Sequence, residues 1–116
     1  VARDELKFDL RDLKTKFLGC GLGPDTDGAF AKQIEDLWGC PVYDMYGTHE
    51  MGMGSFECQA KSGMHFMEDC TFFEIVDTET EQPVPDGTIG NMVCTILFRR
   101  SMPVIRLCLP ADIFDL

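Results

Sequence analysis

The stretch KFLGCGLGP at residues 16–24 gives the first indication of the fold, because a short strand-like run, residues 16–18, enters a glycine-rich loop. Glycine lets a backbone take positive φ or approach a ligand closely. A helix is predicted next, with Asp25 or Thr26 as its cap, Gly39 as its end and four apolar residues on one face, Phe30, Ile34, Leu37 and Trp38. Residues 41–46 alternate like a strand that turns at Gly47. The order strand, helix, strand predicts a β-α-β unit with parallel strands.

The sequence changes to a β pattern after Gly54. Residues 65–77 and 90–98 are rich in aromatic and β-branched residues, a turn signal stands at 83–87, and a third strand is predicted at 104–109. Three strands joined by turns predict a small antiparallel sheet or part of a barrel. The expected fold class is α/β, or α+β for a fragment. Residues 1–54 are expected to end an α/β layer, with residues 2–8 as a helix tail, and residues 55–116 to form a β-rich subdomain.

Composition and chain ends exclude several classes of function. Ten Lys+Arg against twenty Asp+Glu give a formal net charge of −10, which argues against a nucleic-acid partner because nucleic-acid-binding surfaces are basic. No apolar run approaches the roughly 20 residues that span a bilayer, and the first residues lack the layout of a signal peptide. A cytoplasmic protein without a membrane partner is expected. Val1 at the start and the apolar residues 113–116 predict a piece of a longer chain, whose uncovered strands and faces favour self-association.

The six cysteines are irregularly spaced and form no CxxC pair, which predicts reduced thiols. Cys20 lies before a predicted helix start, so it is either a reactive thiol or a packed small residue. A zinc-stabilised domain is a weaker alternative. Its ligands would come from Cys58, His65, Cys70 and Cys108, whose spacing matches no usual structural zinc pattern.

Two glycine-punctuated loops follow the predicted parallel strands and are expected to be neighbours, because ligands of open α/β sheets bind at the carboxyl ends of the strands. The first loop spans residues 19–23. The second concentrates six polar or aromatic residues, Tyr43, Asp44, Tyr46, Thr48, His49 and Glu50. An aromatic ring can stack on a base, a hydroxyl can hold a phosphate and a carboxylate can take Mg²⁺. A plain polar surface has the same composition, so these residues alone leave both interpretations open.

Motifs in a fixed order add to this pattern. YDMYGTHE stands at residues 43–50, FEC at 56–58 and GMHFMED at 63–69. FEIVD follows at 73–77, PDG at 85–87, GNMVCT at 90–95 and MPVIR at 102–106, and Asp112 comes last. The series resembles the phenylacetate-coenzyme A ligase family of the adenylate-forming enzymes, over nearly the whole chain from Leu10 onward. The resemblance implies an AMP-forming acyl- or aryl-CoA ligase. Such an enzyme adenylates a carboxylic acid, here an aryl acid by expectation, with ATP and Mg²⁺ and transfers the acyl group to coenzyme A.

The resemblance also implies roles for individual residues. Tyr46 would stack on the adenine and Asp44 would lie near its amino group. Glu50 would coordinate the Mg²⁺ that bridges the phosphates, with His49 as the second catalytic candidate. Asp112 would bind both ribose hydroxyls through its two acceptor oxygens. The remaining implied nucleotide-binding residues are Gly19, Cys20, Gly21, Gly47 and Thr48.

Three departures from the family pattern qualify the implied activity. His49 stands where the family has Ser or Thr, Pro110 precedes the aspartate in LCLPAD at 107–112, and residues 21–24 read GLGP without the family's glutamate-proline pair. The family's upstream phosphate loop and its downstream domain with a catalytic lysine are not in these residues. The 116 residues alone are therefore expected to be inactive and to need the rest of a parent chain. The alternative is a non-catalytic nucleotide- or ligand-binding protein on the same scaffold.

Overall fold

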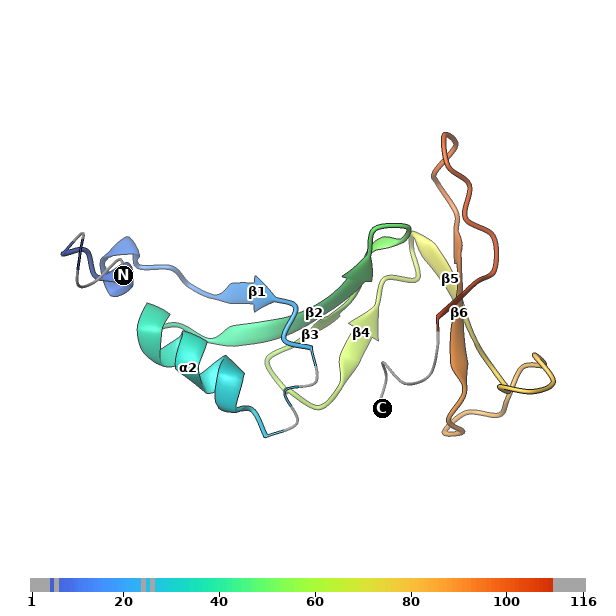
Figure 1. Ribbon diagram of the computed structural model, residues 1–116, viewed down its shortest axis with the longest axis horizontal. Coiled ribbons are helices and arrows are strands. Elements are labelled where there is room, and N and C mark those ends of the chain that lie inside the picture. The colour runs from blue at the N-terminus through green and yellow to red at the C-terminus, as the bar shows by residue number, and fades with distance from the viewer. Residues whose placement is uncertain (1–4, 6, 24, 26, 110–116) are drawn as a thin grey trace. The chain divides into compact units, whose positions relative to one another are not determined.

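The computed structural model describes residues 5, 7–23, 25 and 27–109 and divides into two compact units (Figure 1). The first unit comprises Val1–Tyr46 and Phe56–His65, and the second comprises Gly47–Ser55 and Phe66–Leu116. Within the described part, no helix has the length and apolarity that crossing a membrane requires. The predicted cap Thr26, the departure at Pro110 and the predicted ribose ligand Asp112 lie outside the described residues.

The first unit contains the predicted β-α-β order. Its elements are the 3₁₀ helix η1 (Leu10–Leu13), β1 (Leu18–Cys20), α2 (Ala29–Trp38) and most of β2 (Val42–Thr48). Strands β1 and β2 pair in parallel, with Gly19 opposite Tyr43 and Cys20 opposite Asp44, and their arrows point the same way in Figure 1. The predicted parallel pair is confirmed. Described residues Lys7 and Phe8 are not helical, so the predicted helix tail at 2–8 is wrong there.

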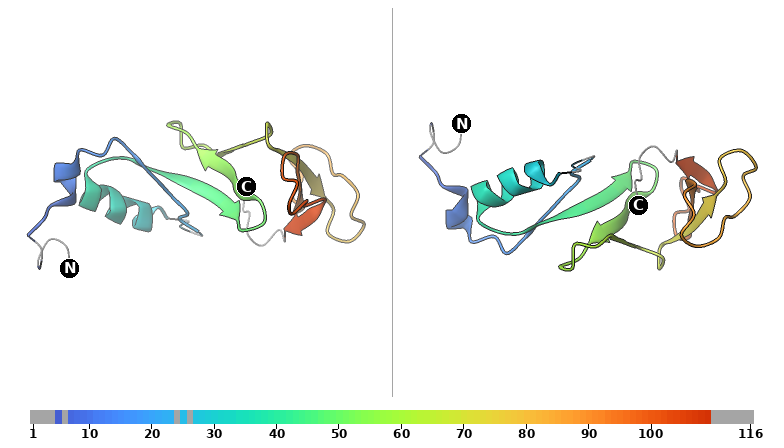
Figure 2. Two further views of the ribbon diagram at one scale, coloured as in Figure 1. Left: turned by 90° about the horizontal axis from the view of Figure 1, so that it is seen from above. Right: turned by 90° about the horizontal axis from the view of Figure 1, so that it is seen from below.

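Asp25 and Gly39, two residues predicted to mark the start and the end of a helix, flank α2. The Asp25 carboxylate accepts hydrogen bonds from the amides of Phe30 and Ala31, at 3.1 and 2.8 Å. Gly39 ends the helix with φ 69° and donates to the Glu35 carbonyl at 2.7 Å, which confirms the predicted end. The last turn of α2 lies beside the start of β2 (Figure 2), where a Glu35 carboxylate oxygen accepts from the Val42 amide at 3.0 Å.

Strands β1 and β2 both extend further along the chain than predicted. Gly19 and Cys20 belong to β1 rather than to the loop after it, because they pair with β2. Strand β2 runs through Gly47 to Thr48, so the predicted turn at Gly47 is wrong and the turn begins at His49. Gly47 instead allows the backbone of β2 to lie close to the backbone at Gly52, since a Cβ at residue 47 would be 2.1 Å from the Gly52 carbonyl oxygen.

The second unit holds the predicted antiparallel sheet. Strands β5 (Thr71–Val76), β6 (Asn91–Ile96) and β7 (Leu107–Leu109) pair antiparallel in the order β5-β6-β7, with Cys94 opposite both Phe73 and Leu107. The buried apolar residues of these strands are Val76, Met92, Val93, Cys94, Ile96 and Leu109. Burial raises the pKa of the Cys94 thiol, and the nearby Glu50 carboxylate adds to the shift, so Cys94 is a core residue rather than a nucleophile.

Two features of the β-rich region differ from the prediction. The predicted strand at 65–77 is two strands, β4 (Met64–Phe66) and β5, because the Met67 carbonyl accepts from the amides of Cys70 and Thr71 and makes a turn between them. Strand β3 (Gly52–Glu57) was not predicted, and it completes a four-stranded sheet of order β1-β2-β3-β4. Of the two glycines that weaken the strand pattern of β3, Gly54 lies against the Met51 side chain, since a Cβ there would be 2.3 Å from Met51 Cε.

Candidate functional site

In the first unit, Asp44 joins the glycine-rich loop to β2. One carboxylate oxygen, Oδ1, accepts from the amide of Leu22 at 2.9 Å and from the amide of Met45 at 2.8 Å. A Cβ on Gly21 would lie 3.5 Å from the Met45 carbonyl oxygen, so the loop backbone runs close to β2. Residues 19–23 therefore adjoin Asp44 on β2, whereas residues 47–50 of the second predicted loop belong to the second unit, so the expectation that the two loops are neighbours stays a prediction. Asp44 acts here as an anchor of the loop.

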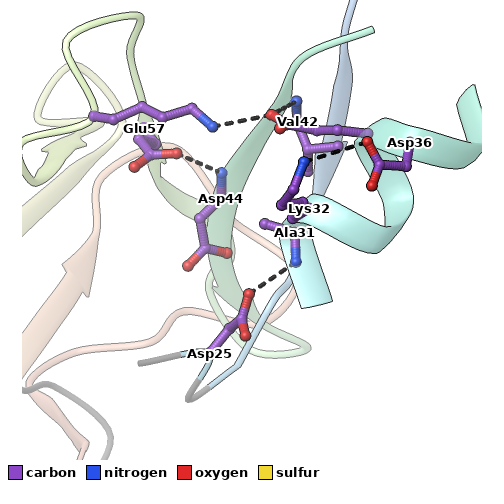
Figure 3. A network of polar contacts seen from close by, with 9 residues as sticks. Asp25, Ala31, Lys32, Asp36, Val42, Asp44 and Glu57 are labelled. Carbon is purple, nitrogen blue, oxygen red and sulfur yellow. Dashed lines mark hydrogen bonds and ion pairs between the residues drawn. The ribbon is translucent and has the colours of Figure 1, made fainter. Parts of the chain in front are cut away.

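The loop borders a half-open cavity of about 310 Å³ in the first unit. Its lining residues are Leu22, Gly23, Asp25, Gly28, Ala31, Asp44, Glu57 and Lys61. Three of these are carboxylates and one is an ammonium. The carboxylates of Asp25 and Glu57 each accept from a backbone amide, as Figure 3 shows: Asp25 from Ala31, and Glu57 Oε2 from Asp44 at 3.2 Å. Hydrogen bonds from backbone amides to carboxylates thus hold the residues of the cavity wall in place.

One edge of this wall is fixed by Glu35 and Lys61. A single Glu35 oxygen, Oε1, accepts from the Val42 amide at 3.0 Å and from Lys61 Nζ at 3.1 Å. The hydrogen bond from Val42 is the larger cause, and that from Lys61 the next, of a Glu35 pKa below its ordinary value. Lys61 Nζ also lies 5.8 Å from the centroid of the Tyr43 ring, within range of a cation–π attraction. Helix α2, strand β2 and the loop at residue 61 are held together by these contacts.

The other predicted residues of the first unit lie on β1 and β2. Tyr46 is half-buried on β2, two residues after Asp44, so both side chains leave the same face of the strand. Gly19 lies against the Met45 side chain, as a Cβ at residue 19 would be only 2.1 Å from the Met45 sulfur. Cys20 is half-buried, beside the start of the loop, with a free thiol. Gly21 follows it in the exposed loop.

In the second unit, the turn after β2 presents Glu50 to solvent. The Thr48 hydroxyl oxygen accepts from the Met51 amide at 3.1 Å, and Arg99 Nη1 donates to the Glu50 carbonyl at 2.6 Å. The Glu50 pKa lies below its ordinary value, chiefly because its carboxylate accepts from its own backbone amide and then from the Thr48 hydroxyl. The charge of His49 adds to this shift, and the side chains of His49 and Glu50 are exposed. The turn therefore holds an ionised, accessible carboxylate.

This carboxylate fits the Mg²⁺ that the family resemblance implies. Mg²⁺ keeps several waters and is usually held by one or two carboxylates together with substrate phosphates, rather than by a cage of protein ligands. Across the described residues, no group of three or more His, Cys, Asp or Glu side chains gathers to hold a metal ion. Of the four zinc candidates, Cys58 and His65 belong to the first unit and Cys70 and Cys108 to the second.

The residues that hold the candidate site residues in place could not be predicted from the sequence. Glu57, Lys61 and Arg99 contact residues that are 13, 26 and 49 positions away along the chain, and no local periodicity predicts such contacts. The one available signal was the motif FEC, which contains Glu57 but carries no chemical role by itself.

Four carboxylates give the stability of the chain a common dependence on pH. The pKa values of Asp25, Glu35, Glu50 and Asp77 all lie below their ordinary values. In each case a hydrogen bond from a backbone amide is the largest cause, the donors being Ala31, Val42, Glu50 itself and Thr80.

We expect the free energy of unfolding to fall between about pH 5 and pH 3. A depressed pKa in the folded state means that the unfolded chain takes up protons first as the pH falls. The stabilisation is therefore complete above the ordinary pKa values and is lost as the pH drops through the lower, folded values. Denaturant unfolding at constant ionic strength measures this dependence, which should be weaker in Asp25→Asn. A free energy that is flat across this range contradicts the assignment.

Comparison with known proteins gives this arrangement a family context. No protein-family model matches the chain. The phenylacetate-coenzyme A ligases of Thermus thermophilus and Pseudomonas putida are 35% and 37% identical to it, over 82% and 85% of its length. A crystal structure of 2-hydroxyisobutyryl-CoA ligase in the postadenylation state, in complex with R3-HIB-AMP, superimposes on 92% of the chain with a TM-score of 0.75 and 32% identity.

The parallel strand pair with its helix and the separate antiparallel sheet thus define a segment of the acid–CoA ligase fold. The chain covers 23% of that ligase structure and 22% to 23% of the two phenylacetate-coenzyme A ligases. It belongs to the phenylacetate-coenzyme A ligase family of the adenylate-forming enzymes.

Proposed function

We propose that this chain forms part of the nucleotide and acyl-adenylate site of an AMP-forming acyl- or aryl-CoA ligase. The complete protein would react a carboxylic acid with ATP to form an acyl-AMP and release pyrophosphate, and would then transfer the acyl group to coenzyme A and release AMP. The relationship to acid–CoA ligases supports this reaction type, and a related ligase has been seen with 2-HIB-AMP and CoA in the thioesterification state. An aryl acid is the proposed substrate, and the chain alone is proposed to be inactive.

The proposed nucleotide contacts of the first unit follow from the loop and strand geometry. Tyr46 would stack on the adenine, since an aromatic face suits a nucleobase. Asp44, which shares the strand face of Tyr46, would lie near the adenine amino group through the oxygen that does not hold the loop. The remaining proposed contacts are Gly19, Cys20 and Gly21, which belong to β1 and the loop after it.

The proposed phosphate contacts lie in the turn of the second unit. Glu50 would hold Mg²⁺ with its ionised carboxylate, while Gly47, Thr48 and His49 would face the phosphates. Bound Mg²⁺ supplies charge neutralisation at the phosphate oxygens. Asp112 would hold the ribose hydroxyls. An imidazole N–H can donate to a phosphate in place of the family's hydroxyl, so His49 is compatible with the same task.

The observation that carries the proposal is the anchoring of the glycine-rich loop by Asp44. The hydrogen bond from the Leu22 amide to the Asp44 carboxylate fixes the loop against β2 before any ligand binds, and a loop that is already ordered favours binding of a ligand. The division of the chain near residue 54, the tendency to self-associate and the location in the cytoplasm stay predictions.

The test uses the complete protein whose sequence includes these residues, incubated with Mg-ATP, coenzyme A and a panel of aryl and aliphatic acids. We expect AMP and one acyl-CoA in equal amounts, detected by chromatography and mass spectrometry. ATP binding without AMP formation for any acid would contradict the ligase proposal and favour the non-catalytic nucleotide-binding alternative. Formation of ADP instead of AMP would contradict both.

A further inference from the structure

We infer that Glu57 is a positioning residue for the proposed nucleotide site, acting through Asp44 on the glycine-rich loop. The inference rests on the proposed function, because it concerns the same loop. Glu57 is the last residue of β3, and its Oε2 accepts from the backbone amide of Asp44 at 3.2 Å (Figure 3). Asp44 Oδ1 in turn accepts from the Leu22 amide at 2.9 Å. Two consecutive hydrogen bonds thus connect β3 to the loop.

The first of these bonds satisfies a backbone donor that needs an acceptor. Asp44 is only partly exposed, and a partly buried amide that loses its partner must reach water or pay a desolvation penalty. Removing the Glu57 carboxylate would therefore shift the backbone at Asp44. Because the Asp44 side chain starts from that backbone, its bond to Leu22 would loosen as well. The loop would then lose its fixed position against β2.

The surrounding cavity supports an organising role for Glu57. Asp25, Asp44 and Glu57 all line the cavity, and each has a carboxylate oxygen that accepts from a backbone amide. Lys61, the ammonium on the same wall, is bonded to Glu35 rather than to these three. The carboxylates are therefore used to order the backbone of the cavity wall.

An ordered loop affects binding more than the chemical step. A loop that is already fixed loses less conformational entropy when a ligand binds, so the affinity for that ligand is higher. Loss of the Glu57 bond is expected to weaken ATP binding by roughly 5- to 10-fold, the effect of about one net hydrogen bond. The KM for ATP should rise by a similar factor, while kcat and the KM for the acid should change little.

The experiment compares Glu57→Ala and Glu57→Gln in the complete protein. Hydrogen exchange of the peptide that contains Leu22, measured without nucleotide, reports the order of the loop, and calorimetry reports ATP affinity. We expect Glu57→Ala to speed hydrogen exchange at Leu22 and to weaken ATP binding. Glu57→Gln should keep both near the values of the unaltered protein, because the glutamine carbonyl can still accept from the Asp44 amide. Asp36→Ala is the matched control, since its carboxylate makes an exposed ion pair with Lys32 and does not line the cavity.

A double-mutant cycle sharpens the test. If Glu57 acts through Asp44, the combined variant Glu57→Ala/Asp44→Ala binds ATP no more weakly than Asp44→Ala alone. Additive losses would overturn the inference, as would unchanged exchange in Glu57→Ala or equal losses in the Ala and Gln variants. An unaltered protein that fails to bind ATP overturns the proposed function instead, and the Leu22 exchange rate still decides whether Glu57 orders the loop.

Discussion

Replacement of Glu50 by Gln is expected to lower acid-dependent pyrophosphate release by about a hundredfold, which corresponds to roughly 3 kcal/mol of transition-state stabilisation. The substitution removes the negative charge while keeping the size of the side chain. Glu50 is exposed and its pKa is depressed, so at neutral pH its carboxylate is ionised and accessible to a cation. Mg²⁺ that is held only by the nucleotide would neutralise the phosphates less effectively.

The matched control is Glu79→Gln, which neutralises an exposed glutamate in the turn after β5, remote in sequence from the proposed site. It should leave release unchanged. The Mg²⁺ concentration for half-maximal rate should rise in Glu50→Gln alone, which separates loss of a metal ligand from general damage. Full activity of Glu50→Gln, with an unaltered Mg²⁺ requirement, would remove Glu50 from the site.

Substitution of Gly47 by Ala is expected to destabilise the protein by about 3 kcal/mol, through overpacking at a point where the structure cannot relax. A Cβ at residue 47 would lie 2.1 Å from the Gly52 carbonyl oxygen and 3.0 Å from the Met53 Cα. These neighbours are backbone atoms, so relief requires the β2–β3 connection itself to open. The turn with Glu50 lies between these strands, and its geometry would be lost together with stability.

Gly21→Ala is the matched control for this prediction. Its Cβ would meet the Met45 carbonyl oxygen at 3.5 Å, an ordinary contact, and Gly21 does not need positive φ. Denaturant unfolding of the two variants measures the difference directly. Equal stability of Gly47→Ala and the unaltered protein would show that the two strands are further apart than the structure places them.

The β-α-β unit could be predicted from the sequence because its signals are local. The apolar spacing in α2, the stop at Gly39 and the strand-like run at residues 41–46 each act within a few residues. Strand β3 could not be predicted, because its sequence GMGSFE contains two glycines and its stability comes from the neighbouring strands. The split between β4 and β5 depends on one carbonyl, that of Met67, which closes the turn.

The candidate site could be predicted only as a set of residue types. The structure has Asp44 as the third residue of β2 and Glu50 in the turn that follows the strand. What these residues bind within the chain was not predictable. The Asp44 carboxylate anchors the Leu22 amide, and Arg99 holds the Glu50 carbonyl from 49 residues away. Such contacts depend on tertiary packing, which leaves no periodic pattern in the sequence.

The most direct test of the adenylate-forming function is exchange of labelled pyrophosphate into ATP by the complete protein. This exchange occurs only when enzyme-bound acyl-AMP forms reversibly, and it needs no coenzyme A. We predict exchange that requires both Mg²⁺ and a carboxylic acid, and that an aryl acid supports best. ATP binding with no exchange for any acid in the panel would contradict the account and identify the chain as part of a nucleotide-binding protein without ligase activity.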